Sequence, residues 1–112
     1  MKKIEAVIRP EKLNEVRMAL EKAGYPGIMI SEIEGHGKQK GVTLQWRGEQ
    51  YKVDLLPKIK IEIVAKDNDT EKIMKTLIDS ARVGETGDGK IFVSPIEEVV
   101  RIRTGEKGDV AL

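Results

Sequence analysis

Hydrophobic residues alternate with polar ones in several short segments of the chain, and this alternation predicts β-strands, whose side chains point to opposite faces in turn. The clearest segment is 58–64, in which isoleucine occupies positions 59, 61 and 63. Apolar-rich segments at 3–8, 28–33 and 91–93 predict further strands, and a β-prone segment at 99–102 predicts a last one. The chain therefore has enough strands to build a sheet.

Two helices are predicted, at 10–23 and 67–81, because apolar residues recur there every three or four positions. Proline at position 10 suits the first turn of the first helix, and Gly24 suits a left-handed cap after it. The second helix is preceded by several candidate N-capping residues, which are Asp67, Asn68, Asp69 and Thr70.

The predicted elements follow the order βαββαβ, and the segment at 99–102 closes the domain. This order is typical of the ferredoxin-like α+β fold, in which the helices pack on one face of an antiparallel sheet. We expect a single domain over residues 1–112, because a chain of 112 residues with 39% hydrophobic content can build one core. The segment 35–56, between the second and third strands, shows no sustained period, so we expect a long functional or mobile loop there.

Composition excludes several classes of function. A net charge of +1 gives no overall field for binding nucleic acid, so any anion site must be local. The chain contains no cysteine, which excludes disulfides, zinc sites with cysteine ligands and thiol catalysis. Its apolar segments are too short to span a bilayer and no signal peptide is evident, so we expect a soluble, cytoplasmic protein.

Two groups of residues could bind phosphate. Gly87-Asp88-Gly89-Lys90 combines flexible glycines with a lysine, so backbone N–H groups and a cation could surround phosphate oxygens, although an ordinary turn has the same composition. Arg101 and Arg103 stand two residues apart on the last predicted strand and would share a face, where they could bind a polyphosphate or form surface ion pairs.

Other polar residues suggest weaker hypotheses. Lys58 and Glu62 share the polar face of the third strand and could bind a carboxylate and an amine, or simply face solvent. The segment 46–51 contains aromatic residues and an arginine, a composition enriched at protein interfaces, although Trp46 could instead fold back as a local anchor. His36 has no second histidine or cysteine with which to form a metal site, and no set of residues resembles a catalytic nucleophile with its base.

Over its whole length the sequence resembles the P-II family of signal-transduction proteins, of the GlnB and GlnK types. The resemblance is carried by 87–93 (GDGKIFV), by 54–63 (DLLPKIKIEI), and by Arg47-Gly48 followed by Tyr51. Lys38 stands where family members often have arginine, and Val83 replaces a hydroxyl residue.

The resemblance implies a homotrimer that binds ATP or ADP, Mg²⁺ and 2-oxoglutarate in clefts between subunits. The residues implied to bind nucleotide are Gly35, Gly37, Lys38, Gln39, Glu62, Val64, Gly87, Asp88, Gly89 and Lys90 of one subunit, with Arg101 and Arg103 of its neighbour. The residues implied to bind 2-oxoglutarate are Gln39, Lys40, Gly41 and Lys58, and Gln39 would also ligate the magnesium ion.

The resemblance also implies how the signal leaves the protein. Nucleotide and 2-oxoglutarate would shift the conformation of the loop at 37–55, the T-loop, which partners read. In GlnK-like members this loop docks at the inner face of the membrane and blocks an ammonium transporter. By this resemblance, Arg47 would enter the pore of the transporter. Other partners of the family are enzymes of nitrogen metabolism. Tyr51 is the candidate site of uridylylation, whereas the loop has no serine for the phosphorylation found in cyanobacterial members.

Two alternatives to this regulatory role remain open. The same pocket could serve a slow ATPase or phosphotransferase, although the sequence offers no evident base or nucleophile. A ferredoxin-like protein that binds an amino acid between subunits would instead bind its ligand without nucleotide.

Overall fold

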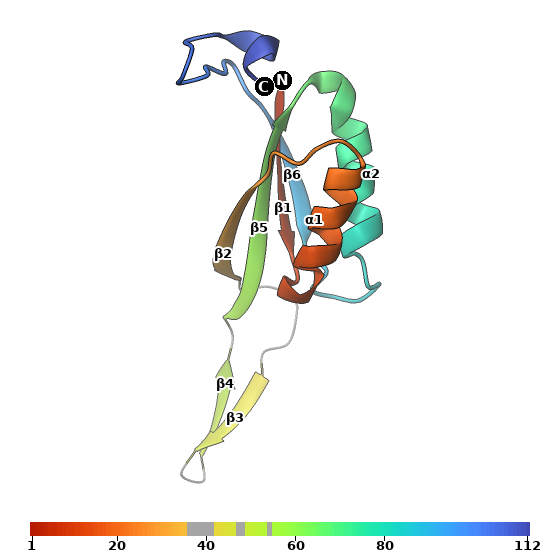
Figure 1. The fold of residues 1–112 in the computed structure, drawn as a ribbon. Coiled ribbons are helices and arrows are strands. Elements are labelled where there is room, and N and C mark those ends of the chain that lie inside the picture. The colour runs from red at the N-terminus through yellow and green to blue at the C-terminus, as the bar shows by residue number, and fades with distance from the viewer. Residues whose placement is uncertain (36–41, 47–48, 54) are drawn as a thin grey trace.

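The computed structural model describes residues 1–35, 42–46, 49–53 and 55–112, and for the two segments between 42 and 53 it describes the backbone only. Four antiparallel strands form the main sheet in the order β2-β5-β1-β6 (Figure 1). Their bounds are β1 Lys2–Ile8, β2 Met29–Gly35, β5 Leu56–Ala65 and β6 Lys90–Pro95. The two helices are α1 Leu13–Lys22 and α2 Thr70–Ala81.

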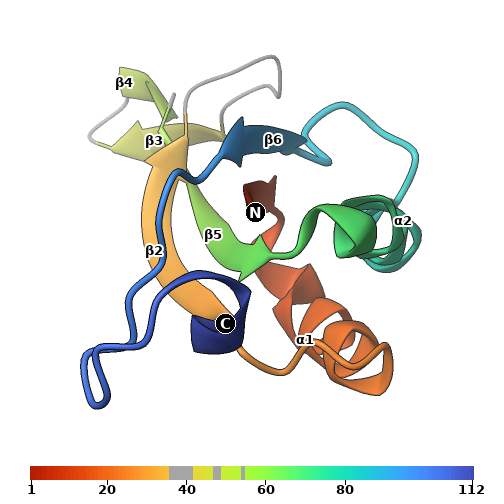
Figure 2. The same ribbon diagram turned by 90° about the horizontal axis from the view of Figure 1, so that it is seen from above.

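Both helices lie on the same side of this sheet (Figure 2), which confirms the predicted ferredoxin-like α+β arrangement. The core forms because every second residue of β1 and β5 faces the helices. In the register of these strands, Ile4 lies opposite Ile63 and Ala6 opposite Ile61, and all four are almost completely buried. The helices complete the core with the apolar residues that the spacing predicted, which include Val16, Leu20, Ile73 and Leu77.

The other face of the sheet is covered by neither helix. The same alternation places charged residues of β1 and β5 on it, and Lys3 pairs with Glu5 at 2.9 Å while Lys60 pairs with Glu62 at 3.2 Å. Phe92 shares this face, because β6 places it opposite Glu5, and it remains 54% exposed. A large apolar side chain is thus left in contact with solvent within a single chain.

The ends of the helices agree only in part with the sequence. Gly24 has a positive φ of 100° and its N–H donates to the Glu21 carbonyl, so the predicted cap after α1 is confirmed. At the start of α2, Asp69 occupies the N-cap position without a side-chain cap, so the predicted capping is wrong. Its carboxylate instead accepts from the Tyr25 hydroxyl at 2.9 Å, and Asp67 pairs with the N-terminal ammonium at 2.9 Å.

Two further predictions need correction. Residues 99–102 form no strand of the main sheet, since only an isolated bridge joins Val100 to Lys107. The segment 35–56 was expected to have no regular structure, but β3 (Val42–Trp46) and β4 (Glu49–Val53) form an antiparallel hairpin within it. Its register pairs Val42 with Val53 and Leu44 with Tyr51, so a short strand alternation was present and was missed.

Candidate functional site

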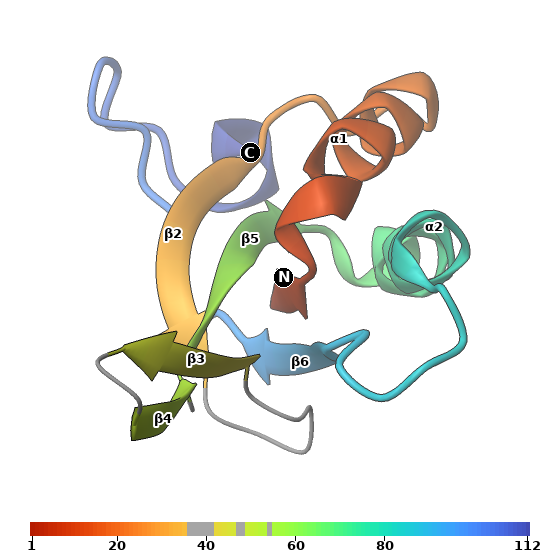
Figure 3. The same cartoon turned by 90° about the horizontal axis from the view of Figure 1, so that it is seen from below.

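The candidate site is built around the glycine loop, residues 82–89, which joins α2 to β6 at one end of the sheet (Figure 3). Gly84, Gly87 and Gly89 have φ values of 94°, 102° and 108°, a conformation that residues with a Cβ rarely adopt. At Gly89 a Cβ would also overlap the carbonyl oxygen of Val7. The loop can therefore lie directly against the end of β1 only because glycine occupies this position.

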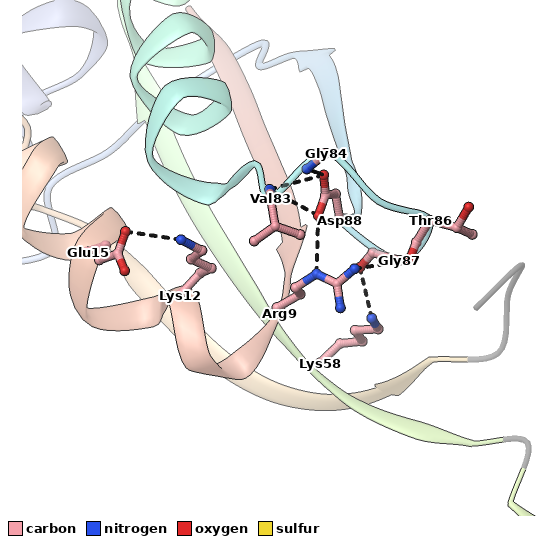
Figure 4. Close-up of polar contacts among 9 residues, drawn as sticks. All are labelled: Arg9, Lys12, Glu15, Lys58, Val83, Gly84, Thr86, Gly87 and Asp88. Carbon is pink, nitrogen blue, oxygen red and sulfur yellow. Dashed lines mark hydrogen bonds and ion pairs between the residues drawn. The ribbon is translucent and has the colours of Figure 1, made fainter. Parts of the chain in front are cut away.

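The Asp88 carboxylate closes this loop (Figure 4). It accepts hydrogen bonds from the backbone N–H of Gly84 at 2.8 Å and of Val83 at 3.2 Å, and it pairs with Arg9 Nε at 3.1 Å. The Gly84 N–H, followed by the Arg9 and Val83 donors, holds the pKa of Asp88 below its usual value, although partial burial opposes this shift. Asp88 is thus a carboxylate that the loop itself binds.

Two cations reach the loop from neighbouring strands (Figure 4). Arg9 follows β1 and also donates through Nη2 to the Thr86 carbonyl at 2.9 Å, with its side chain only 11% exposed. Lys58, on β5, donates through Nζ to the Gly87 carbonyl at 3.0 Å. Burial, followed by repulsion from Arg9, lowers the pKa of Lys58. Together they make one end of the sheet locally cationic, which suits an anionic ligand.

Sequence reasoning missed Arg9. The available signal was an arginine directly after an apolar strand and before a proline. The register pairs Ile8 with Ile59, and this places the residue after β1 beside Lys58. The sequence alone does not give that register.

Several predicted nucleotide residues lie on or near this end of the sheet. Gly35 ends β2 against the Lys58 side chain, since a Cβ at Gly35 would lie 3.1 Å from Lys58 Cγ. Lys90 opens β6, opposite Val7, and is exposed. Glu62 and Val64 lie further along β5, on the same face as Lys58. The structure thus brings Gly35, Lys58 and the glycine loop together.

Arg101 and Arg103 do not join this group within one chain. They belong to the C-terminal hairpin, residues 99–108, at the opposite end of the sheet from the glycine loop (Figure 1). The Arg101 guanidinium contacts Glu106 Oε1 and the Val110 carbonyl, both at 2.8 Å, whereas Arg103 is exposed. The prediction that both arginines leave one face of a sheet strand is therefore wrong.

Some predicted residues cannot be placed. Gly37, Lys38, Gln39, Lys40, Gly41 and Arg47 lie outside the described residues. Tyr51 is described only by its backbone, in β4 opposite Leu44.

Among the described residues no cluster of His, Asp or Glu could hold a metal ion, and none of the helices is long and apolar enough to cross a membrane.

A cavity of about 330 Å³ lies between α2, β1 and the start of β6, and Asp88, Gly89 and Lys90 line part of it. Its lining includes Ala6, Leu77 and Ala81, which face the helix-covered side of the sheet. Lys58 and Glu62 belong to the other face of the sheet, so the cavity adjoins the glycine loop but does not reach these two predicted ligand residues.

Comparison with known proteins gives one consistent result. The family model described as "Nitrogen regulatory protein P-II" matches residues 1–106. The chain is 54% identical over 112 residues to "Nitrogen regulatory protein P-II 2" of Methanothermobacter thermautotrophicus, covering all of this chain and 97% of that protein. It is also 54% identical over 112 residues to proteins named "Nitrogen regulatory protein P-II" from Nostoc punctiforme and Azospirillum brasilense, with both chains covered completely.

Proposed function

Because the chain belongs to the P-II family of nitrogen regulatory proteins, we propose that it senses ATP or ADP together with 2-oxoglutarate and passes the result to partner proteins. The observation that carries this proposal is the glycine loop with its converging cations. Arg9 and Lys58 both donate to the loop backbone, and Lys90 follows it directly. A glycine-rich backbone beside fixed cations is a general solution for binding phosphate.

The ligands can be assigned along the open face of the sheet, which is the face that neither helix covers. We assign the nucleotide phosphates to Gly87, Gly89 and Lys90, and the adenine to Glu62 and Val64. Burial, followed by repulsion from Arg9, lowers the pKa of Lys58, and a ligand carboxylate would offset both effects by pairing with the cation, so we assign a carboxylate of 2-oxoglutarate to it.

The rest of the ligand assignment falls on Gly35, at the end of β2, and on the loop at 37–55. Gln39 would hold Mg²⁺ together with ligand oxygens, because this hard cation prefers such donors. Gly35, Gly37 and Lys38 would complete the nucleotide site, and Lys40 and Gly41 the 2-oxoglutarate site.

We propose that a second subunit completes the site. Arg101 and Arg103 lie at the far end of the sheet from the glycine loop, so within one chain they are remote from it. A neighbouring subunit could supply them if copies of the chain associated through the open face of the sheet, where Phe92 and Met29 are 54% and 55% exposed. We therefore propose that the chain forms a homotrimer through this face, and analytical ultracentrifugation tests its oligomeric state.

Nucleotide binding is tested by calorimetric titration of ADP. We expect Lys90→Ala to weaken binding at least about tenfold, because a charge-assisted hydrogen bond to phosphate is lost. Lys75→Ala is the matched control, since Lys75 is an exposed lysine of α2 paired only with Asp79 among the described contacts. Equal affinities of the two variants would refute the assignment, and sustained ATP turnover that Lys90→Ala abolishes would favour an enzyme instead.

The output is proposed to pass through the loop at 37–55 to an ammonium transporter at the inner face of the membrane, and to enzymes of nitrogen metabolism. We expect Arg47→Ala to keep ADP affinity and to lose sedimentation with transporter-containing membranes. Unchanged sedimentation would remove Arg47 from the contact. Mass analysis of Tyr51 after incubation with a uridylyltransferase tests its modification.

A further inference from the structure

We propose that Asp88 is a positioning residue, whose carboxylate holds the glycine loop and Arg9 in place and does not itself contact the nucleotide. For its effect on binding, the inference rests on the proposed function. The loop geometry that it invokes belongs to the chain without any ligand.

The Asp88 carboxylate is already bound by three N–H donors of the chain. An ionised carboxylate offers about four lone-pair sites on its two oxygens. Oδ1 accepts from Arg9 Nε, Oδ2 accepts from the Gly84 N–H, and the single Val83 N–H is shared between the two oxygens at 3.2 Å from each. These donors occupy most of the acceptor sites of Asp88, so a ligand donor or metal ion would compete with them for the carboxylate.

The contacts of Asp88 join residues that are far apart in the sequence. Val83 and Gly84 follow the end of α2, whereas Arg9 follows β1 and is separated from Asp88 by 79 positions. Asp88 therefore closes the loop on itself next to the end of α2 and ties it to Arg9, the residue after β1. Its own N–H donates to the Glu85 carbonyl at 3.3 Å, which closes the same turn.

The charges around Asp88 also favour a positioning role. Arg9 and Lys58 both contact the loop, and Arg9 lowers the pKa of Lys58 whereas Asp88 raises it. A carboxylate placed directly against phosphate would weaken binding by repulsion. Bound to Arg9, the carboxylate fixes the guanidinium, and its charge offsets part of the repulsion that Arg9 exerts on Lys58.

The first arm of the test uses the protein without ligand. Amide exchange of Val83 and Gly84 is measured by NMR in the wild type, Asp88→Ala and Asp88→Asn. We expect exchange at least about tenfold faster in Asp88→Ala, because both amides lose a charged acceptor, and a smaller increase in Asp88→Asn. Glu85→Gln is the matched control, since it neutralises an exposed carboxylate of the same loop. Unchanged exchange at Gly84 in both Asp88 variants would overturn the proposal.

The second arm separates positioning from direct contact. ADP is titrated into the same variants with Mg²⁺ and with EDTA. A positioning role predicts that Asp88→Ala weakens ADP binding about tenfold or more in both conditions, with Asp88→Asn between it and the wild type. A loss seen only with Mg²⁺ would show a direct metal contact, and tighter binding would show simple repulsion, and either would overturn the proposal.

The two arms also distinguish this inference from the proposed function. If the wild type binds no ADP, the proposed function fails, and the exchange rates alone decide whether Asp88 holds the loop. If Asp88→Ala does not fold, as judged by circular dichroism, the comparison of Asp88→Asn with Glu85→Gln decides both arms.

Discussion

The glycine loop and the C-terminal hairpin both carry residues predicted to bind phosphate, but the chain holds them in different ways. In the loop, Arg9 and Asp88 are 79 positions apart, and the Arg9 side chain is 11% exposed. In the hairpin, Arg101 and Glu106 are 5 positions apart, and the Arg101 side chain is 34% exposed. The loop is therefore fixed by contacts between distant parts of the chain, whereas the C-terminal hairpin is fixed mainly by its own local contacts.

This difference suggests a division of roles. A region that the core fixes can present a preformed site, because its ordering is complete before the ligand arrives. The hairpin carries Ile102, which is 99% exposed, at the tip beside Arg103. An exposed arginine beside an exposed isoleucine is better suited to act on a neighbouring subunit than on its own.

The largest expected effect comes from adding one methyl group to each region. Gly89→Ala should lower the free energy of unfolding by at least about 2 kcal/mol, because the new Cβ combines a strained φ with a clash against the Val7 carbonyl. Gly105→Ala in the hairpin should cost about 1 kcal/mol, since a Cβ there meets nothing within 4 Å. Urea unfolding measures both, and equal losses would show that the loop is no more constrained than the hairpin.

A smaller effect is expected from removing each arginine. Arg9→Gln should lower the thermal midpoint by about 5 °C, because it leaves Asp88 and the Thr86 carbonyl without a donor from β1. For Arg101→Gln we expect about 2 °C or less, because its partner Glu106 is 40% exposed and can be solvated. Calorimetric melting of the two variants tests this order, and the reverse order would contradict the account of the loop.

The smallest effect should appear when the pH is lowered below about 4. The pKa of Asp88 is lowered in the folded protein, so its contribution to stability is complete above the ordinary value of 3.8 and is lost as the pH falls through the lower folded value. In wild type the Gly84 amide should therefore lose protection below about pH 4, beyond the loss in Asp88→Asn. NMR exchange corrected for intrinsic rates measures this, and identical profiles would show that the charge of Asp88 is unimportant.

Local pattern was enough to predict most of the fold. The alternation around Ile59, Ile61 and Ile63 and the helical spacing of Leu20 and Leu77 both depend on burial, and all five residues lie in the core. The glycine loop was also predicted as a phosphate-binding candidate, because its glycines are visible in the sequence.

The failures share a physical cause, which is competition between contacts. Val99 to Ile102 is β-prone, but Gly105 has a φ of 73° and its N–H donates to the Arg101 carbonyl, so the chain turns back on itself. Asp69 could have capped α2, but the Tyr25 hydroxyl binds its carboxylate. Arg9 joins the site only through strand register, which no single segment contains.

We propose that this P-II protein couples the binding of nucleotide to that of 2-oxoglutarate at the end of the sheet that holds the glycine loop. The most direct measurement is calorimetric titration of 2-oxoglutarate into the protein with MgATP, with MgADP and without nucleotide. We predict that 2-oxoglutarate gives binding heat only in the presence of MgATP. We also predict that this heat is lost in Lys58→Met. Binding of equal strength without nucleotide, or no binding in any of the three conditions, would contradict the account.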